Sequence, residues 1–299
     1  MISGQTCLVG LLGQPVDHSL SPVIQNAALK EMGLDWCYLA MPCKAEDLKM
    51  VTKALRNLNC KGLNITIPHK QQAVDICDHV SSIAKNLGAI NTLIPNQEGG
   101  WNGANTDVEG FLAPLKTKHW GGKKVIVIGN GGSARAVMAG LHGLKLDEIT
   151  VIGRSQNNLN RFINNLSKKI FKSEDNTLSL QGLLQSNPEV IEKITQANLI
   201  INTTPIGMSA KGYVSVENDA IPLGKDIWKH LKTKTVLYDL IYTPRPTPWL
   251  KLGIENGFEI IDGLEMLIQQ GAASLKLWTQ EDEIPINTMK KAAKKHLEN

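Results

Sequence analysis

No stretch of this 299-residue sequence approaches the roughly 18 consecutive apolar residues that a membrane-spanning helix requires. The first residues also lack the basic-then-apolar order of a secretory signal peptide. The five cysteines are odd in number and show no C-x-x-C spacing, so the sequence indicates neither a disulfide framework nor a paired-cysteine metal or redox motif. These absences predict a soluble, cytoplasmic protein with reduced thiols.

A strong excess of one charge is missing as well. The formal net charge is only +4, which suits anionic small molecules but is too small and too dispersed for a nucleic-acid interface. With 42% hydrophobic residues, the chain can still build a sizeable core. We therefore expect a small-molecule substrate and no nucleic-acid or membrane partner. The sequence leaves the oligomeric state open, and a homodimer is one alternative.

The sequence does contain an apolar strand pattern that ends in a glycine-rich turn. Residues 124–128 read Lys-Val-Ile-Val-Ile, and the residues after them follow the pattern G-x-G-x-x-A before a helix-compatible segment. Such glycines allow a sharp turn and close approach of a ligand, and the N–H groups at the helix start attract a pyrophosphate. The context favours a dinucleotide site over a simple tight turn. The residues expected to form it are Gly129, Asn130, Gly131, Gly132, Ser133 and Ala134.

The acidic residue that selects NAD in such folds is absent after the next predicted strand, 148–152. That strand is followed by Gly153, Arg154 and Ser155. A guanidinium suits the 2′-phosphate of NADP, so we expect Arg154 and Ser155 to contribute to an NADP site. The alternative is that Arg154 is only a solvated loop residue. Hydride transfer from a nicotinamide needs no metal, and no metal site is expected.

The position of the glycine turn indicates two domains, because more than a hundred residues precede it. Alternating strand and helix patterns predict an α/β fold with two domains. We expect an N-terminal α/β substrate domain at 1–107, completed by C-terminal helices at 264–299 that return to it. A doubly wound Rossmann domain is expected at 108–263. The expected strands are 6–12, 36–41, 62–67, 124–128, 148–152, 199–202, 236–240 and 258–261, and the expected helices include 22–32, 45–58, 70–80 and 264–279. Residues 156–196, which are rich in Asn, Lys and Ser, are expected to form a surface helix, a loop and a second helix.

A lysine and an aspartate are the strongest candidates for proton transfer. Asn64 and Thr66 share one face of a predicted strand, and Lys70 follows at a helix start. Asp107 comes just before the expected domain junction. A Lys–Asp pair there would be a general acid/base couple. Taken alone, each residue would more often be a surface ion pair or a helix cap.

Several motifs in one order are more specific than any one of them. With its motifs at 18–22, 64–70, 88–92, 105–107, the glycine turn, 239–242 and 262–270, the chain resembles the shikimate/quinate dehydrogenase family over nearly its full length. The resemblance implies NADPH-dependent reduction of the C3 ketone of 3-dehydroshikimate to shikimate, a step toward chorismate and the aromatic amino acids.

The resemblance also implies a role for each matching residue. Lys70 would be the acid/base residue with Asp107 as its partner, and Tyr242 would close the carboxylate end of the substrate site. The remaining implied contacts are Ser19 and Ser21 to the substrate carboxylate, Thr66, Asn91, Asp107 and Gln270 to the ring hydroxyls, and Leu240 and Gly263 to the nicotinamide. Ser19 and Ser21 also fit a helix-capping role.

Two departures from the family pattern leave alternatives open. Asn130 and Ser133 stand where the family often has alanine, but both are small and the key glycines remain, so a cofactor site is still expected. Residues 156–158 replace a further arginine, which weakens the expectation of strict NADP selectivity. An NAD-preferring quinate/shikimate dehydrogenase is the first alternative, and Arg154 speaks against it. A non-catalytic NADP-binding sensor is the second, and the presence of Lys70 and Asp107 speaks against that.

Overall fold

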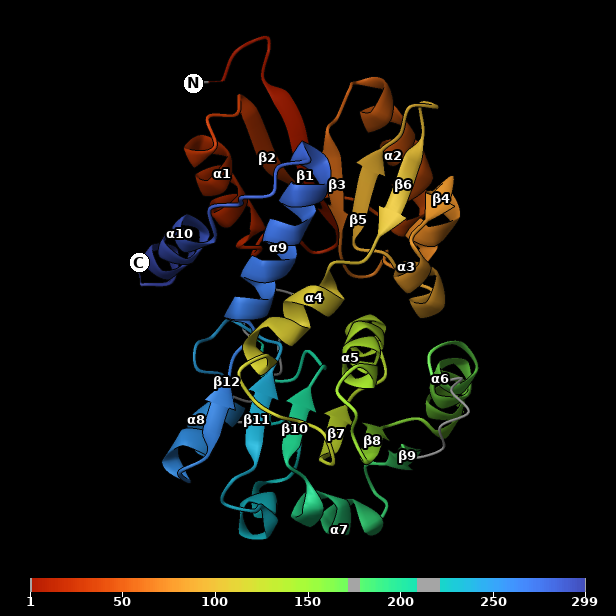
Figure 1. The fold of residues 1–299 in the computed structure, drawn as a ribbon, viewed down its shortest axis with the longest axis vertical. Coiled ribbons are helices and arrows are strands. Elements are labelled where there is room, and N and C mark those ends of the chain that lie inside the picture. Colours follow the sequence, from red (N-terminus) through yellow and green to blue (C-terminus); the bar gives the residue numbers. More distant parts are fainter. Residues whose placement is uncertain (1, 172–177, 209–220, 299) are drawn as a thin grey trace. The chain divides into compact units, whose positions relative to one another are not determined.

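The computed structural model describes residues 2–171, 178–208 and 221–298 (Figure 1). The chain divides into two compact units, one of Met1–Ala113 with Met266–Asn299 and one of Pro114–Glu265. Our expected boundaries lay at 107/108 and 263/264. The first changeover comes later because helix α4 (Asp107–Leu112) packs within the first unit: a Cβ on Gly110 would lie 2.6 Å from the Met266 carbonyl oxygen. None of the described helices is both long and apolar enough to span a bilayer.

The first unit contains a mixed sheet of six strands, in the order β2-β1-β3-β5-β6-β4. Strand β1 runs parallel to β2 and β3, whereas β5 is antiparallel to both β3 and β6, and β4 is parallel to β6. Its elements are β1 (Cys7–Gly13), α1 (Ser21–Glu31), β2 (Trp36–Pro42), α2 (Leu48–Asn57), β3 (Gly62–Ile65), β4 (His79–Val80), α3 (Ser82–Leu87), β5 (Thr92–Pro95), β6 (Trp101–Ala104) and α4.

The C-terminal helices α9 (Leu264–Thr279) and α10 (Ile286–Leu297) complete this unit, as we expected. Buried hydrogen bonds attach α9 to α1 and to β5. Gln25 donates its side-chain amide to the Gly271 carbonyl at 3.0 Å, and the Trp278 indole donates to the Leu93 carbonyl at 3.0 Å. Buried polar groups that are paired in this way fix which face of α9 meets the sheet.

The second unit is built on an all-parallel sheet in the order β12-β11-β10-β7-β8-β9 (Figure 1). This is the doubly wound strand order of a Rossmann fold, and it confirms the predicted fold class. The elements are β7 (Lys124–Ile128), α5 (Gly132–His142), β8 (Glu148–Gly153), α6 (Gln156–Lys169), β9 (Ser179–Leu184), α7 (Glu189–Gln196), β10 (Leu199–Asn202), β11 (Val236–Asp239), α8 (Pro248–Glu255) and β12 (Glu259–Ile261).

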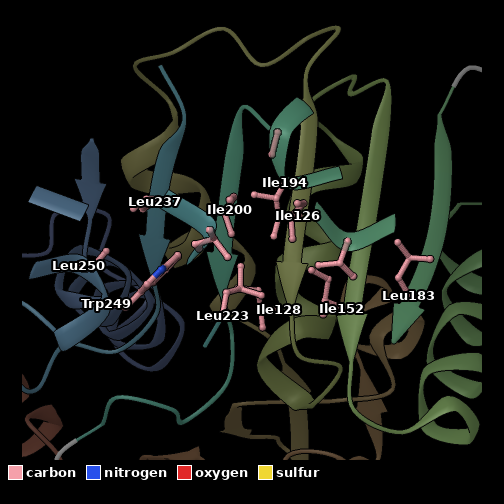
Figure 2. Close-up of a cluster of buried hydrophobic side chains, with 13 residues drawn as sticks. Ile126, Ile128, Ile152, Leu183, Ile194, Ile200, Leu223, Leu237, Trp249 and Leu250 are labelled. Atoms are coloured by element: carbon pink, nitrogen blue, oxygen red, sulfur yellow. The ribbon is translucent and has the colours of Figure 1, made fainter. Parts of the chain in front are cut away.

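The core of the second unit explains why its strands carry continuous apolar runs. Ile126 and Ile128 of β7, Ile200 of β10 and Leu237 of β11 are at most 3% exposed. Figure 2 shows these side chains in one cluster with Trp249 of α8. Strands that are covered on both faces have no solvated side, so no polar alternation appears in their sequence.

Two expected segments differ from the structure. The helix predicted at 70–80 is only a 3₁₀ helix at Gln72–Ile76, followed by the short strand β4. Between the helices predicted in 156–196, strand β9 forms where we expected a loop; residues 172–177 of that loop lie outside the described residues. Both errors concern short segments in which apolar spacing covers too few residues to separate helix from strand.

Candidate functional site

Four segments of the first unit meet at one edge of its sheet. β1 and β3 are parallel, so the residues that follow them, Ser19 and Thr66 to Lys70, leave the same edge. β5 is antiparallel to β3 and therefore begins at this edge, directly after Asn91, while β6 ends there shortly before Asp107. The carboxyl edge of parallel strands is where α/β proteins place their ligands. Topology thus gathers residues that are far apart in the sequence.

The central pair of this edge is Lys70 and Asp107. The Lys70 ammonium donates to Oδ2 of Asp107 at 2.6 Å, and the side chains are 15% and 8% exposed. An ammonium has three N–H donors, and Asp107 is its only hydrogen-bond partner in the described part of the chain, so two donors remain for a ligand. An ion pair that is this well shielded from water is held in one geometry, unlike a mobile surface pair.

Asn91 and Gln270 extend the pair into a connected polar group. Asn91 donates its amide to Oδ1 of Asp107 at 2.9 Å and to Oε1 of Gln270 at 3.3 Å. Both oxygens of Asp107 are therefore engaged, one by a cation and one by an amide. The structure thus joins four of the predicted site residues, Lys70, Asn91, Asp107 and Gln270, through direct hydrogen bonds.

A buried hydroxyl cluster lies beneath this group, and our sequence reasoning missed it. The Ser274 hydroxyl, 0% exposed, lies 2.9 Å from the Thr92 hydroxyl and 3.2 Å from that of Thr106, and it donates to the Gln270 carbonyl at 3.0 Å. Thr106 in turn donates its backbone N–H to Oδ1 of Asn91 at 2.8 Å, which sets the orientation of that amide. The available signal was a serine one helical turn after Gln270, which places both residues on the same face of the helix.

Ser19, Ser21 and Thr66 belong to the same unit but make no hydrogen bond to the Lys70 group among the described residues. The Ser19 hydroxyl accepts the backbone N–H of Ser21 at 3.2 Å, but Leu20 is the N-cap residue of α1 and no described side chain caps this helix, so the capping interpretation is wrong. Thr66 packs against the end of β1, where a Cβ on Gly13 would lie 2.2 Å from its methyl group. Within the described residues, the hydroxyls of Ser21 and Thr66 have no hydrogen-bond partner, which leaves them available to a ligand.

The glycine turn of the second unit has the form that a dinucleotide requires. Gly129 has a φ of 103°, and a Cβ there would lie 2.6 Å from the Thr203 hydroxyl, so a side chain is excluded. Cβ atoms on Gly131 and Gly132 would meet nothing within 4 Å, and no described side chain caps the start of α5. Open space above uncapped N–H groups fits a pyrophosphate. Ala134, 0% exposed, lets α5 pack closely against the sheet, and Asn130 and Ser133 flank the turn.

Arg154 and Ser155 lie directly after β8, the strand that pairs with β7. The Gly129 N–H donates to the Ile152 carbonyl at 2.9 Å, so the glycine turn and the end of β8 are neighbours. Both residues are exposed, and within the described residues the Arg154 guanidinium makes no hydrogen bond or ion pair. The structure therefore presents a cation beside the turn, and the last three residues of β8 include no carboxylate.

Leu240, Tyr242 and Gly263 follow β11 and β12 at the corresponding edge of the second sheet. A Cβ on Gly263 would lie only 2.0 Å from the Leu240 carbonyl oxygen, and the Gly263 N–H donates to the Ile241 carbonyl at 3.1 Å. Glycine at 263 is thus required for the approach of the two segments. Arg245 forms an ion pair with Asp262, which joins the same two segments a second time.

Asp239, the last residue of β11, is fully buried, and burial raises its pKa to about 7. Hydrogen bonds from Ile241, Thr247 and Asn202 oppose this rise, and the charge of Asp262 adds to it. The unfolded chain would release the proton near the ordinary value of 3.8, so between about pH 4 and pH 7 the folded protein holds the extra proton.

We therefore expect the free energy of unfolding to fall as the pH rises through this window, and the contribution of Asp239 to level off above it. Asp239→Asn cannot titrate, so the difference in unfolding free energy between wild type and variant should shrink with rising pH. Denaturant unfolding at intervals from about pH 4 to about pH 8 measures this difference. A difference that stays constant with pH would contradict the expectation.

Comparison with known proteins gives matches along the chain. Family models for the shikimate dehydrogenase substrate binding domain, for shikimate/quinate 5-dehydrogenase and for the shikimate 5′-dehydrogenase C-terminal domain match residues 11–93, 112–212 and 263–294. Shikimate dehydrogenase (NADP(+)) of Prochlorococcus marinus strain MIT 9215 is 48% identical over 99% of this chain and 100% of its own length.

Solved structures resemble the chain over a similar extent. Shikimate 5-dehydrogenase of Thermus thermophilus, in complex with NADP(H) and shikimate, is 30% identical with a TM-score of 0.80 and covers 97% of this chain and 99% of its own. Quinate dehydrogenase of Corynebacterium glutamicum, in complex with NAD, is 26% identical with a TM-score of 0.84, over 97% and 99%. With near-complete coverage and 48% identity to the Prochlorococcus enzyme, the chain belongs to the shikimate dehydrogenase family.

Proposed function

We propose that this protein is an NADP-dependent shikimate dehydrogenase that reduces the C3 ketone of 3-dehydroshikimate to shikimate, and that it catalyses the reverse reaction as well. The observation that carries the proposal is the shielded pair of Lys70 and Asp107, 2.6 Å apart and tied to Asn91 and Gln270. A binding protein without catalysis has no need of a proton donor held in this way. The same pair argues against the sensor alternative.

Bound NADPH supplies the hydride to the ketone carbon. The negative charge that develops on the C3 oxygen needs a proton, and the Lys70 ammonium has two N–H donors that no described residue accepts. Lys70 donates one of them and Asp107 holds the lysine side chain in place while it does so. In the reverse direction, Lys70 takes the proton from the C3 hydroxyl of shikimate.

The other residues of the first unit suit a small polyhydroxy acid. Hydroxyl groups can both donate to and accept from amides, and they donate to carboxylates; Asn91, Asp107 and Gln270 form one such set. The hydroxyls of Ser21 and Thr66, for which the described residues provide no hydrogen-bond partner, add two groups that can donate to a carboxylate or a ring oxygen. Ser19 is already used by the Ser21 backbone as acceptor, and its own O–H remains able to donate to the substrate carboxylate.

The second unit would hold the nucleotide through its own residues. The uncapped start of α5 and the open space at Gly131 and Gly132 suit the pyrophosphate, and Arg154 with Ser155 suits the 2′-phosphate. Leu240 and Gly263 would line the nicotinamide pocket, and Tyr242 would contact the substrate carboxylate.

All five cysteines are free thiols, and we propose the cytoplasm as the location.

Nicotinamide absorbance tests the proposal directly. Purified protein is mixed with shikimate or quinate and with NADP or NAD, in all four pairings. The expected result is turnover confined largely to shikimate with NADP. Comparable turnover of quinate or a preference for NAD would instead support the alternative dehydrogenase, and absence of turnover in every pairing would overturn the proposed activity.

Arg154→Ala is expected to raise the KM for NADPH by about tenfold or more, because a charge-assisted hydrogen bond to the 2′-phosphate is worth roughly 1.5–3 kcal/mol. The KM for NADH should change little, since NADH lacks this phosphate. Steady-state kinetics with both cofactors measure the ratio. Arg161→Ala is the control: this exposed arginine on α6 donates to the Asn158 side chain at 2.6 Å. An equal rise in the KM for NADH would show that Arg154 does not bind the 2′-phosphate.

A further inference from the structure

A single buried carboxyl group ties down both ends of the loop at 240–247. Asp239 is 0% exposed and accepts three hydrogen bonds. Oδ1 accepts the backbone N–H of Ile241 at 3.1 Å and the amide of Asn202 at 3.0 Å, and Oδ2 accepts the Thr247 hydroxyl at 2.8 Å. Ile241 lies near the beginning of the loop, and Thr247 is its last residue.

The far end of the loop is fixed by the same contact that starts helix α8. The Thr247 hydroxyl accepts the backbone N–H of Leu250 at 3.3 Å and donates to Asp239, so the cap of α8 depends on the carboxyl group. Asn202, at the end of β10, also accepts the N–H of Thr204 at 3.0 Å and its hydroxyl at 2.7 Å. Asp239 therefore connects the loop to the segment after β10, which lies against the glycine turn at Gly129.

The chemistry of the carboxyl group explains how far it can be replaced. An alanine at 239 would leave three buried donors without their acceptor, and each such loss is costly in the protein interior. An asparagine would keep one oxygen for Ile241 and Asn202 and would place an amide N–H toward the Thr247 oxygen. The conservative change should therefore preserve most of the loop geometry.

We propose that Asp239 is a positioning residue for the reaction, which sets Leu240 and Tyr242 in place by fastening the 240–247 loop at both ends. The inference rests on the proposed function, which assigns Leu240 to the nicotinamide and Tyr242 to the substrate carboxylate. Asp239 itself is buried and touches neither ligand. Its effect is transmitted through the backbone of the loop.

The test compares Asp239→Ala, Asp239→Asn and Thr247→Val with the matched control Thr235→Val. Thr235 is also 0% exposed and donates one buried hydrogen bond, to the Ala197 carbonyl at 2.8 Å, but it lies just before β11, at the opposite end of that strand from Asp239. Three quantities are measured: amide hydrogen exchange at 240–247 without ligand, the dissociation constant of NADP by calorimetry, and kcat with KM for shikimate.

Asp239→Ala is expected to speed exchange at the Ile241 amide by at least about tenfold, to weaken NADP binding by about tenfold and to lower kcat/KM further. Thr247→Val should produce a smaller change of the same kind, and Asp239→Asn should restore all three to within about threefold of wild type. The Thr235→Val control should leave exchange in the loop and NADP binding unchanged, even where its overall stability falls.

If Asp239→Ala and Thr235→Val alter the loop and the kinetics equally, or if exchange at 240–247 does not respond to Asp239→Ala, the positioning role is overturned. If Asp239→Ala does not fold, Thr247→Val decides by the same criteria. Wild-type protein that binds NADP but turns over no shikimate would overturn the proposed function, while loop exchange and NADP binding would still decide the role of Asp239.

Discussion

Replacing Lys70 by alanine is expected to lower kcat about 10²–10⁴-fold, which corresponds to roughly 3–5 kcal/mol of transition-state stabilisation. The variant loses the only group of the Lys70–Asp107 pair that can give a proton to the developing alkoxide. KM for shikimate should change little, because Asn91, Asp107 and Gln270 remain to bind the ring hydroxyls. Steady-state kinetics in both directions, over a range of pH, measure the effect.

Two further variants separate proton transfer from structural damage. Lys70→Gln keeps an N–H donor toward Asp107 but has no proton to give, so it should lose turnover like the alanine variant while retaining more stability. Lys276→Ala is the control. The exposed Lys276 ammonium forms an ion pair with Asp282 at 2.7 Å and is not part of the Lys70 group, so its loss should leave kcat unchanged. Near-normal turnover in Lys70→Ala would remove Lys70 from the acid/base role.

The Rossmann unit could be predicted well because its sequence carries strong local signals. The buried run at 124–128 and the glycines after it impose a strand and a tight turn whatever surrounds them. The parallel pairing then follows from the alternation of strands with helices. Strand β9 was not predicted because it is an edge strand that includes Ser179, Gln181 and Gly182. Most of its side chains are only partly buried.

The first unit was harder to predict because its strands are short and their partners are distant in sequence. β5 and β6 have four residues each and contain proline, glycine or asparagine, so periodicity gives almost no signal. The sequence could offer the pairing of Lys70 with Asp107 only as a possibility. The pair forms because β5 runs antiparallel to both β3 and β6, so that β3 and β6 end at the same edge of the sheet.

Buried polar residues that act through others had the weakest signal. Asp239 lies inside a motif that the sequence singled out and Ser274 lies just beyond one, but nothing in a single sequence distinguishes a residue that touches a ligand from one that holds its neighbour. Their roles follow from burial and from hydrogen bonds across distant segments, such as Ser274 to Thr92 and Asp239 to Asn202. Helix and strand patterns encode neither.

Asp107→Ala is expected to lower kcat by at least about a hundredfold and, unlike Lys70→Ala, to raise the KM for shikimate, because Asp107 would bind a ring hydroxyl as well as hold Lys70. The informative measurement is the double variant. Groups that act as one unit are strongly non-additive, so Lys70→Ala with Asp107→Ala should lose about as much kcat as the worse single variant.

Two independent contributions would instead multiply, and a double variant whose loss equals the product of the single losses would rule out a coupled pair. Glu109→Ala is the matched control, since Glu109 is an exposed carboxylate two residues further along α4 and should change neither constant. Asp107 binds the lysine through Oδ2 and Asn91 through Oδ1. Asn91→Ala frees one oxygen of Asp107 and leaves the proton donor in place, so its loss of kcat should lie between that of Glu109→Ala and that of Asp107→Ala. A graded series of this kind follows only if the hydrogen-bonded group works as a single unit around Lys70.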